Sequence, residues 1–203
     1  MSTKFVLTLL SAVTLCSTTP LSARPPVQQA SARPQYGPNI VRFTPVTVFD
    51  NSVGIGFSYE RILDKDGKIS VNIPVCLGIN MNNGYNGWGY STNTNYSIFL
   101  NPGVKFYPAG QRRVTYALGA SLFTMMGEDD YYYGGPANEE ADYFRAGIMI
   151  NNYVHFNITP KFNLGLELGV GPRYINQYRT TQSTFSDGIS VSAQFGFHMG
   201  FRF

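Results

Sequence analysis

The clearest pattern in the chain is an alternation of apolar and polar residues at its carboxyl end. From Ile189 to Phe203 every second residue is Ile, Val, Ala, Phe or Met, and the residues between are Ser, Gln, Gly, His or Arg. A period of two is that of an extended strand whose two faces meet different surroundings, whereas a helix would scatter these residues around its axis. At about 3.3 Å per residue, a tilted strand of this length crosses a hydrocarbon core.

The same alternation upstream predicts seven further strands. It is clear at 53–60, 69–80 and 162–171, less regular at 96–107, 114–126 and 143–158, and of uncertain phase in a first strand within 40–49. Pro74 cannot donate a ladder hydrogen bond, so we expect a bulge or a missing bond there. Asn152 falls on an apolar face, so either a bulge at Asn151 and Asn152 shifts the phase or Asn152 faces lipid.

The connections between these strands alternate in length. Those at 50–52, 64–67, 108–113 and 159–161 are short, and those at 81–95, 127–142 and 176–188 are long and rich in polar residues and Gly. Transmembrane barrels have short periplasmic turns and longer extracellular loops. Counting strands places every long loop on one side and both termini on the other. The sequence therefore predicts an all-β, eight-stranded antiparallel up-and-down transmembrane barrel over residues 39–203.

The amino-terminal segment has the features of an export signal. Lys4 precedes an apolar run of about a dozen residues, and Ala23 offers a small residue for cleavage. We expect a signal peptide at 1–23 and a Pro-rich flexible leader at 24–38. A lipoprotein signal ending at Cys16 is an alternative, although bulky Leu15 fits it poorly. Removal of the signal leaves Cys76 as the single Cys, which excludes an intrachain disulfide.

Charged residues are scarce, at 13% of the chain, and fall on the polar face of the predicted strands. A Lys or Arg that faces lipid at mid-depth costs about 2–4 kcal/mol. The interior of an eight-stranded barrel is just wide enough for side chains, and buried charges must pair. We therefore predict a closed lumen in which Glu60 and Glu167 pair with some of the inward cations. The predicted lumen network consists of Glu60, Lys105, Arg145, Glu167, Arg173, His198 and Arg202.

The last nine residues, Phe195 to Phe203, resemble the terminal signal of outer-membrane barrels. In that family, alternating aromatics and a final Phe are recognised by the barrel-assembly machinery, which assigns this role to Phe201 and Phe203. His198 departs from the pattern, because the signal often carries Gly there. The region from Ile40 onward resembles the eight-stranded class of the OmpA membrane domain and OmpX. The resemblance implies an outer-membrane location, contact with outer-membrane lipid and a Gram-negative source.

Candidate chemistry is sparse. His155 and His198 lie on the predicted inward face, where each is a metal ligand, a general base or a polar lumen residue; no second ligand stands at a metal spacing, which favours the last. The acidic residues at 129–142 are a calcium site or a solvated loop. Neither His lies in the His-x-Ser pair of the lipid A deacylase family, so we expect no enzyme and no cofactor.

The small net charge of +3 is scattered, which excludes nucleic acid as a partner. We expect a structural or surface-interaction role in which loops 81–95, 127–142 and 176–188 contact an extracellular protein or polysaccharide. A lipid-modifying outer-membrane enzyme and a soluble secreted ligand-binding barrel, with its apolar face inward, are the alternatives.

Overall fold

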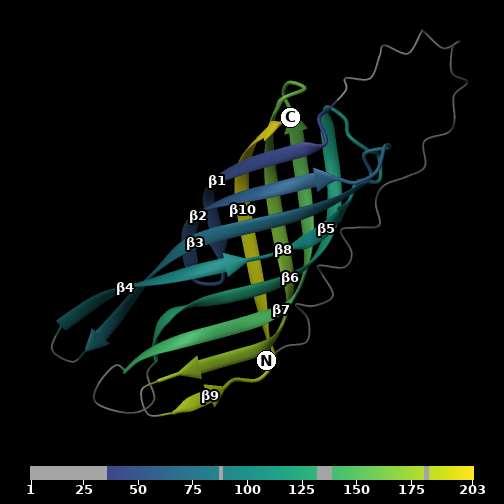
Figure 1. Ribbon diagram of the computed structural model, residues 1–203. Coiled ribbons are helices and arrows are strands. Elements are labelled where there is room, and N and C mark those ends of the chain that lie inside the picture. Colours follow the sequence, from purple (N-terminus) through teal and green to yellow (C-terminus); the bar gives the residue numbers. More distant parts are fainter. Residues whose placement is uncertain (1–35, 87–88, 132–138, 181–182) are drawn as a thin grey trace, which may run out of the picture. The chain divides into compact units, whose positions relative to one another are not determined.

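The computed structural model describes residues 36–86, 89–131, 139–180 and 183–203, without the side chains of 80–93 and 129–140. The expected signal peptide at 1–23, and the leader as far as residue 35, lie outside this part of the chain. The described residues form strands only (Figure 1), and they include no helix with the length and apolar character needed to cross a membrane. The strands are β1 (Asn39–Phe49), β2 (Ser52–Ile62), β3 (Ile69–Asn86), β4 (Gly89–Leu100), β5 (Gly103–Phe106), β6 (Val114–Tyr131), β7 (Glu139–Asn157), β8 (Phe162–Arg179), β9 (Thr184–Ser186) and β10 (Ser190–Arg202).

These strands close into an eight-stranded antiparallel barrel, as the sequence predicts. Each wall strand pairs with its neighbour in the chain, and β1 pairs with β10 to complete the ring. β4 and β5 are two parts of one wall strand, because β3 pairs with both of them and β6 pairs with both on the other side. β9 adds a short strand beside the end of β8. Closure pairs every wall strand on both sides through the apolar belt, which is what a strand-built membrane protein requires.

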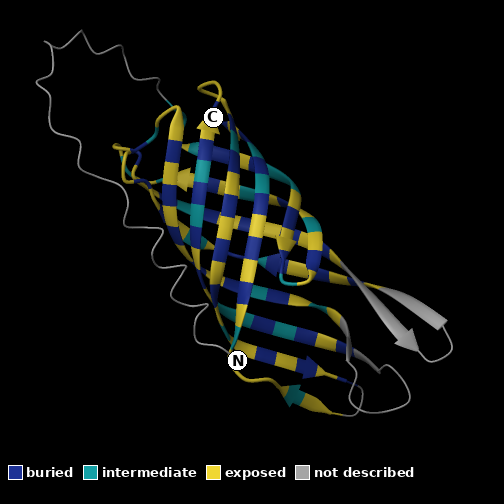
Figure 2. Cartoon of the chain, turned by 180° about the vertical axis from the view of Figure 1, so that it is seen from behind, coloured by how far each residue is buried: buried dark blue, intermediate teal, exposed yellow. Residues whose placement is uncertain are grey.

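The pleat turns apolar side chains outward and polar side chains inward. Buried and exposed residues alternate along the wall strands, which gives the banding of Figure 2. Phe57, Leu122 and Val191 are 59%, 64% and 69% exposed on the outer face, whereas Arg42 and Glu60 are 1% and 0% exposed in the interior. A water-soluble barrel would hide the first group and expose the second. The alternative in which the apolar face points inward is therefore wrong.

Pro74 and Asn152, where the sequence predicts an irregularity in the sheet, are both accommodated without a bulge. Pro74 pairs with Ser58 without a bulge between β2 and β3, but on the other side the ladder stops opposite Asn101 and Pro102 and resumes at Gly103. Asn152 pairs in register with Leu118 and Leu168, so no bulge shifts its phase. Its side-chain oxygen instead accepts a 2.7 Å hydrogen bond from the Tyr116 hydroxyl on the outer face.

The two ends of the barrel differ. The end that holds Asn39 and Phe203 carries the short connections at 63–68, 107–113 and 158–161, and we call it the turn end. At the other, hairpin end, much of the three segments predicted as long loops consists of paired strands. β3 and β4 stay paired up to Asn86 and Gly89, and β6 and β7 up to Tyr131 and Glu139. The loop prediction was wrong there, because polar residues beyond the apolar belt continue the ladder that the belt begins.

The interior is not uniformly polar, contrary to the expectation from its sequence phase. Towards the hairpin end it holds a cluster of buried side chains, which we call the apolar plug: Phe49, Cys76, Phe99, Phe123, Met125, Tyr143, Met149 and Tyr178. The rings of Phe49 and Phe99 stack with centroids 5.0 Å apart, and Phe123 lies 6.0 Å from Phe99. Polar side chains fill the rest of the interior, towards the turn end.

Candidate functional site

A buried ionic cluster lies around Glu60 in the polar part of the interior. Its carboxylate accepts hydrogen bonds from Ser70 at 2.7 Å and from the Tyr107 hydroxyl, and it forms ion pairs with Arg42 and with Lys105, whose Nζ lies 3.0 Å away. Glu60 and Lys105 are therefore brought together. Sequence reasoning missed Arg42, because the phase of the first strand was uncertain, and Tyr107, which stands just after a strand end.

Two other predicted lumen cations meet a carboxylate that sequence reasoning left in a turn. Asp50, at the tip of the β1–β2 hairpin, lies 2.9 Å from Arg173 and 3.8 Å from Arg145, measured from Oδ2 to Nη1. Asp50 has a φ of 47°, and Ser192 donates to the same oxygen at 3.3 Å. Arg145 and Arg173 thus lie beyond the apolar plug, in a second ionic cluster remote from Glu60.

The remaining predicted residues form no ion pair in the described part of the chain. His198 Nε2 lies 3.1 Å from His155 Nδ1, and Arg202 donates a 2.6 Å hydrogen bond to Gln111. Glu167 forms no ion pair with any described residue. All seven predicted lumen side chains lie inside the barrel wall, and no three metal-ligating side chains cluster among the described residues. These buried groups lie in separate clusters along the interior.

The predicted assembly residues lie on the opposite face from this network. Phe201 and Phe203 are 53% and 59% exposed at the turn end, and the backbone amide of Phe203 donates to the carbonyl of Asn39. The acidic side chains at 129, 130, 139 and 140, and the Tyr residues at 131–133, fall outside the described side chains.

A cleft lies between β4 and β6 at the hairpin end of the wall. The ladder between these strands runs only from Leu100 and Thr124 to Ser97 and Gly127. Beyond that pair, β4 stays with β3 and β6 stays with β7, so the two hairpins separate. A Cβ on Gly127 would lie 2.4 Å from the carbonyl oxygen of Tyr96, so glycine permits this last close pairing. The cleft that opens there has a volume of about 840 Å³.

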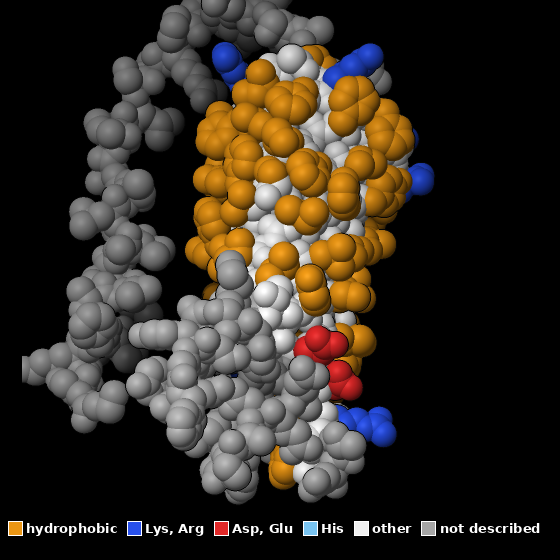
Figure 3. Space-filling view, turned by 90° about the vertical axis from the view of Figure 1, so that its left-hand side faces the viewer, with side chains coloured by type: hydrophobic (Ala, Val, Ile, Leu, Met, Phe, Trp, Pro, Cys, Tyr) orange, Lys and Arg blue, Asp and Glu red, His pale blue; other side chains and the backbone are white. Residues whose placement is uncertain are grey.

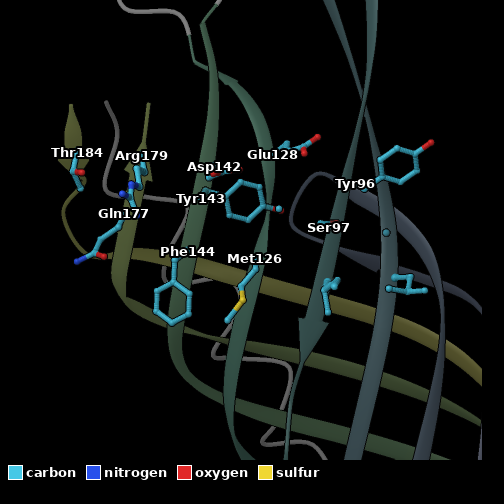
Figure 4. A pocket seen from close by; sticks show the side chains of 14 residues that line it. Tyr96, Ser97, Met126, Glu128, Asp142, Tyr143, Phe144, Gln177, Arg179 and Thr184 are labelled. Carbon is cyan, nitrogen blue, oxygen red and sulfur yellow. The ribbon is translucent and has the colours of Figure 1, made fainter. Parts of the chain in front are cut away.

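The lining of the cleft changes from apolar to charged along the wall. Met126 and Phe144 are register partners on β6 and β7, and Ile98 continues their row on β4. Glu128 and Asp142 are also register partners, and each lies two positions closer to the rim than Met126 or Phe144, on the same outer face. Figure 4 shows this arrangement, with the two carboxylate residues above the Met126 and Phe144 side chains.

The cleft also reaches the inside of the barrel. Ser97 and Tyr143 line it from the interior face, whereas Ile98 and Met126 line it from the face that carries the apolar belt. Gln177, Arg179 and Thr184 complete its rim from β8 and β9. A cavity that meets water, charged rim residues and an apolar belt at once suits a molecule with an apolar chain and a polar head. Sequence alternation gave no signal of it, because strands that separate keep the same period as strands that pair.

Comparison with known proteins identifies the fold. No family model and no curated protein matches the chain. Among solved structures, a major outer membrane protein of Thermus thermophilus is 13% identical and covers 81% of this chain and 98% of its own length, with a TM-score of 0.56. OprG of Pseudomonas aeruginosa is 9% identical, with coverages of 83% and 96% and a TM-score of 0.55. Ail, the attachment invasion locus protein of Yersinia pestis, is 10% identical, with coverages of 83% and 100% and a TM-score of 0.51. The chain has the fold of small outer-membrane β-barrels.

Proposed function

We propose that the chain is an outer-membrane barrel of the Gram-negative envelope that interacts with surface molecules through its hairpin end. The support is threefold: the fold is that of small outer-membrane barrels, an apolar belt surrounds the wall, and the interior is filled with side chains. A belt of this kind is stable in lipid, because the exposure of so large an apolar surface to water is unfavourable. The short turns then face the periplasm and the hairpins face outward.

The site of interaction is the cleft between β4 and β6, and its ligand is an amphipathic molecule. The observation that carries this proposal is the end of the β4–β6 ladder at Ser97 and Gly127, which opens the wall where the apolar belt gives way to charge. An apolar chain would lie along Ile98, Met126 and Phe144, and its head group would lie at the rim.

The charges at the rim favour a cationic or zwitterionic head group. Glu128 and Asp142 are both exposed, and among the described residues of the lining Arg179 alone is basic. One neighbour in structure, Ail, has been solved in complex with the heparin analogue sucrose octasulfate. A polyanion of that kind would be repelled by the two carboxylates, so its binding is not transferred to this chain.

We propose no catalytic step. The described residues of the cleft lining include Ser97 but no His, the usual base that activates a Ser nucleophile. Altered lipid A in a deletion strain would support the lipid-modifying alternative instead.

The location is tested by membrane fractionation. The folded protein should separate with outer membrane and change its mobility on gels when boiled. Recovery of the mature chain in the soluble periplasm or the medium would overturn the proposed location.

The cleft is tested by fluorescence quenching in phosphatidylcholine nanodiscs. Phe144→Trp, in a Trp88→Phe background, places a reporter in the cleft. Leu122→Trp places a control on the apolar belt, on the neighbouring strand β6. A brominated alkyl-trimethylammonium probe should quench the reporter at severalfold lower concentration than the control, and a brominated alkyl sulfate should not. Equal quenching at both positions would show simple partition into lipid and would overturn the proposal.

The role of the carboxylates is tested in the same assay. Glu128→Gln with Asp142→Asn should abolish the advantage of the cationic probe. Asp187→Asn is the matched control, because Asp187 is an exposed acid at the hairpin end that does not line the cleft. An advantage that survives the double substitution would contradict the assignment of the head-group site.

A further inference from the structure

Exposed charges are separated between the two ends of the barrel. The turn end carries a set of exposed cations that we call the basic rim: Arg61, Lys65, Lys68, Arg112, Arg113 and Lys161. Asp64 and Asp66 are the only acidic side chains in the same turns. At the hairpin end, the exposed charges among the described side chains are Glu128, Asp142 and Asp187 against Arg179. Figure 3 shows Lys and Arg around the upper end, and acidic side chains with a basic one beside them below the apolar belt.

The backbone of the basic rim is fixed by local hydrogen bonds. Asp64 accepts the backbone amides of Lys68 at 2.8 Å and Ile69 at 2.7 Å, which closes the first turn. Gln111 of the second turn donates to the carbonyl of Gly67 at 3.1 Å, so these two turns are joined. In the third turn the Thr159 hydroxyl accepts the amide of Phe162 at 2.9 Å. The cations are thus carried on ordered turns.

The side chains of the basic rim are largely free of partners within the barrel. Arg112 donates to the carbonyl of Ala109, but in the described part of the chain the side chains of Lys65, Lys68, Arg113 and Lys161 form no ion pair or hydrogen bond. The carboxylate of Asp64 is occupied by the turn amides. The rim therefore presents a net positive charge that nothing within the described barrel neutralises.

The position of the basic rim relative to the apolar belt indicates its partner. Exposed apolar residues end the belt directly beside these turns: Leu63, Ile69, Phe106, Val114 and Ile158. Long cationic side chains next to the edge of an apolar belt extend to the head-group layer of the bilayer. We propose that the basic rim binds the head groups of anionic phospholipids in the leaflet at the turn end, whose phosphodiesters carry the complementary charge. The six cations surround the barrel, so they collect an anionic shell of lipid and do not form one pocket.

The proposal is tested with spin-labelled lipids. The whole barrel is reconstituted in phosphatidylcholine vesicles, and the association constants of spin-labelled phosphatidylglycerol and phosphatidylcholine are compared from their motionally restricted fractions. We expect a severalfold preference for phosphatidylglycerol at low salt that falls as salt screens the charges. Replacement of Lys65, Lys68, Arg113 and Lys161 by Gln should remove the preference, and Asp66→Asn should increase it.

Matched controls separate this rim from other sources of charge. Arg179→Gln at the hairpin end should leave the preference unchanged, and gel mobility before and after boiling confirms that each variant is folded. If the fourfold variant fails to fold, Lys65→Gln with Lys161→Gln should still lower the preference. Equal association of the two lipids with the native protein, or a preference that survives in the folded variants, would overturn the proposal. So would binding of polyglutamate without any phosphatidylglycerol preference, which would indicate a soluble polyanion as the partner.

Discussion

Lys105 Nζ lies 3.0 Å from Glu60 Oε2, and the two side chains are 2% and 0% exposed. Arg42 contacts the same carboxylate, so one anion compensates two buried cations. The stability of the barrel depends on the Glu60 carboxylate, because a buried charge that loses its partner lowers the free energy of unfolding.

Glu60→Gln should therefore destabilise the barrel strongly. We expect a loss of about 3–5 kcal/mol in the free energy of unfolding, measured by urea titration in phospholipid vesicles. Glu167→Gln is the control and should cost less, because Glu167 forms no ion pair with any described residue. Equal losses in the two variants would contradict the central role of Glu60.

The hydrogen bond between Tyr116 and Asn152 predicts a coupled pair on the outer face. Tyr116→Phe should cost about 1–3 kcal/mol of unfolding free energy, because it leaves the Asn152 amide without this partner. Asn152→Leu in the Tyr116→Phe background should recover most of that loss. Additive effects in the double-mutant cycle would show that the two side chains do not interact.

The apolar plug predicts a closed lumen. The purified protein in planar bilayers should give no large stepwise ion currents, because stacked Phe49 and Phe99 fill the interior. Simultaneous replacement of Phe49, Phe99 and Phe123 by Ala should make conductance steps detectable. Large steps from the native protein would refute the plug, and a silent but folded triple variant would assign closure to the polar residues below it.

The first turn predicts a local dependence on pH. Desolvation acts to raise the pKa of Asp64, but hydrogen bonds from the amides of Ile69 and Lys68 and the charge of Lys68 outweigh it, and the pKa is lowered. The turn is thus stabilised above the unfolded-state pKa of Asp64, and this stabilisation is lost as pH falls through the lower, folded-state pKa. Hydrogen exchange at the amides of Lys68 and Ile69, corrected for intrinsic rates, should show protection that falls in acid. Asp64→Asn should flatten this dependence, and an unchanged pH profile in that variant would contradict the assignment.

The fold can be predicted from the sequence because a barrel wall separates lipid from the lumen. Apolar and polar residues therefore alternate along each strand with a period of two. This is why Ile189 to Phe203 predicts both the strand and its outward face. Ion-pair partners are less accessible, because they depend on which strands meet across the lumen. Thus Arg173 was among the cations available to Glu60 or Glu167, but its partner in the structure is Asp50, at the tip of the β1–β2 hairpin.

The plug and the cleft escaped prediction for different reasons. Phe99 and Phe123 occupy the inward phase of strands whose alternation is irregular, so their direction is fixed only by register with neighbours. The cleft depends on where two strands cease to pair, and Ile98 and Met126 alternate alike on either side of that point. Local patterns report the face of a residue, but not the length of a ladder.

The unequal height of the wall has a consequence for access from the hairpin side. β3 continues for seven residues, Asn80–Asn86, beyond the level at which Ile79 pairs with Val53 of β2, or roughly 20 Å of extended strand. Antibodies or proteases applied to intact cells would therefore reach the β3–β4 and β6–β7 tips first, while the tip at Asp50 stays recessed. Insertions or epitope tags should be accepted at the tall hairpins and should disturb folding when placed at the recessed one.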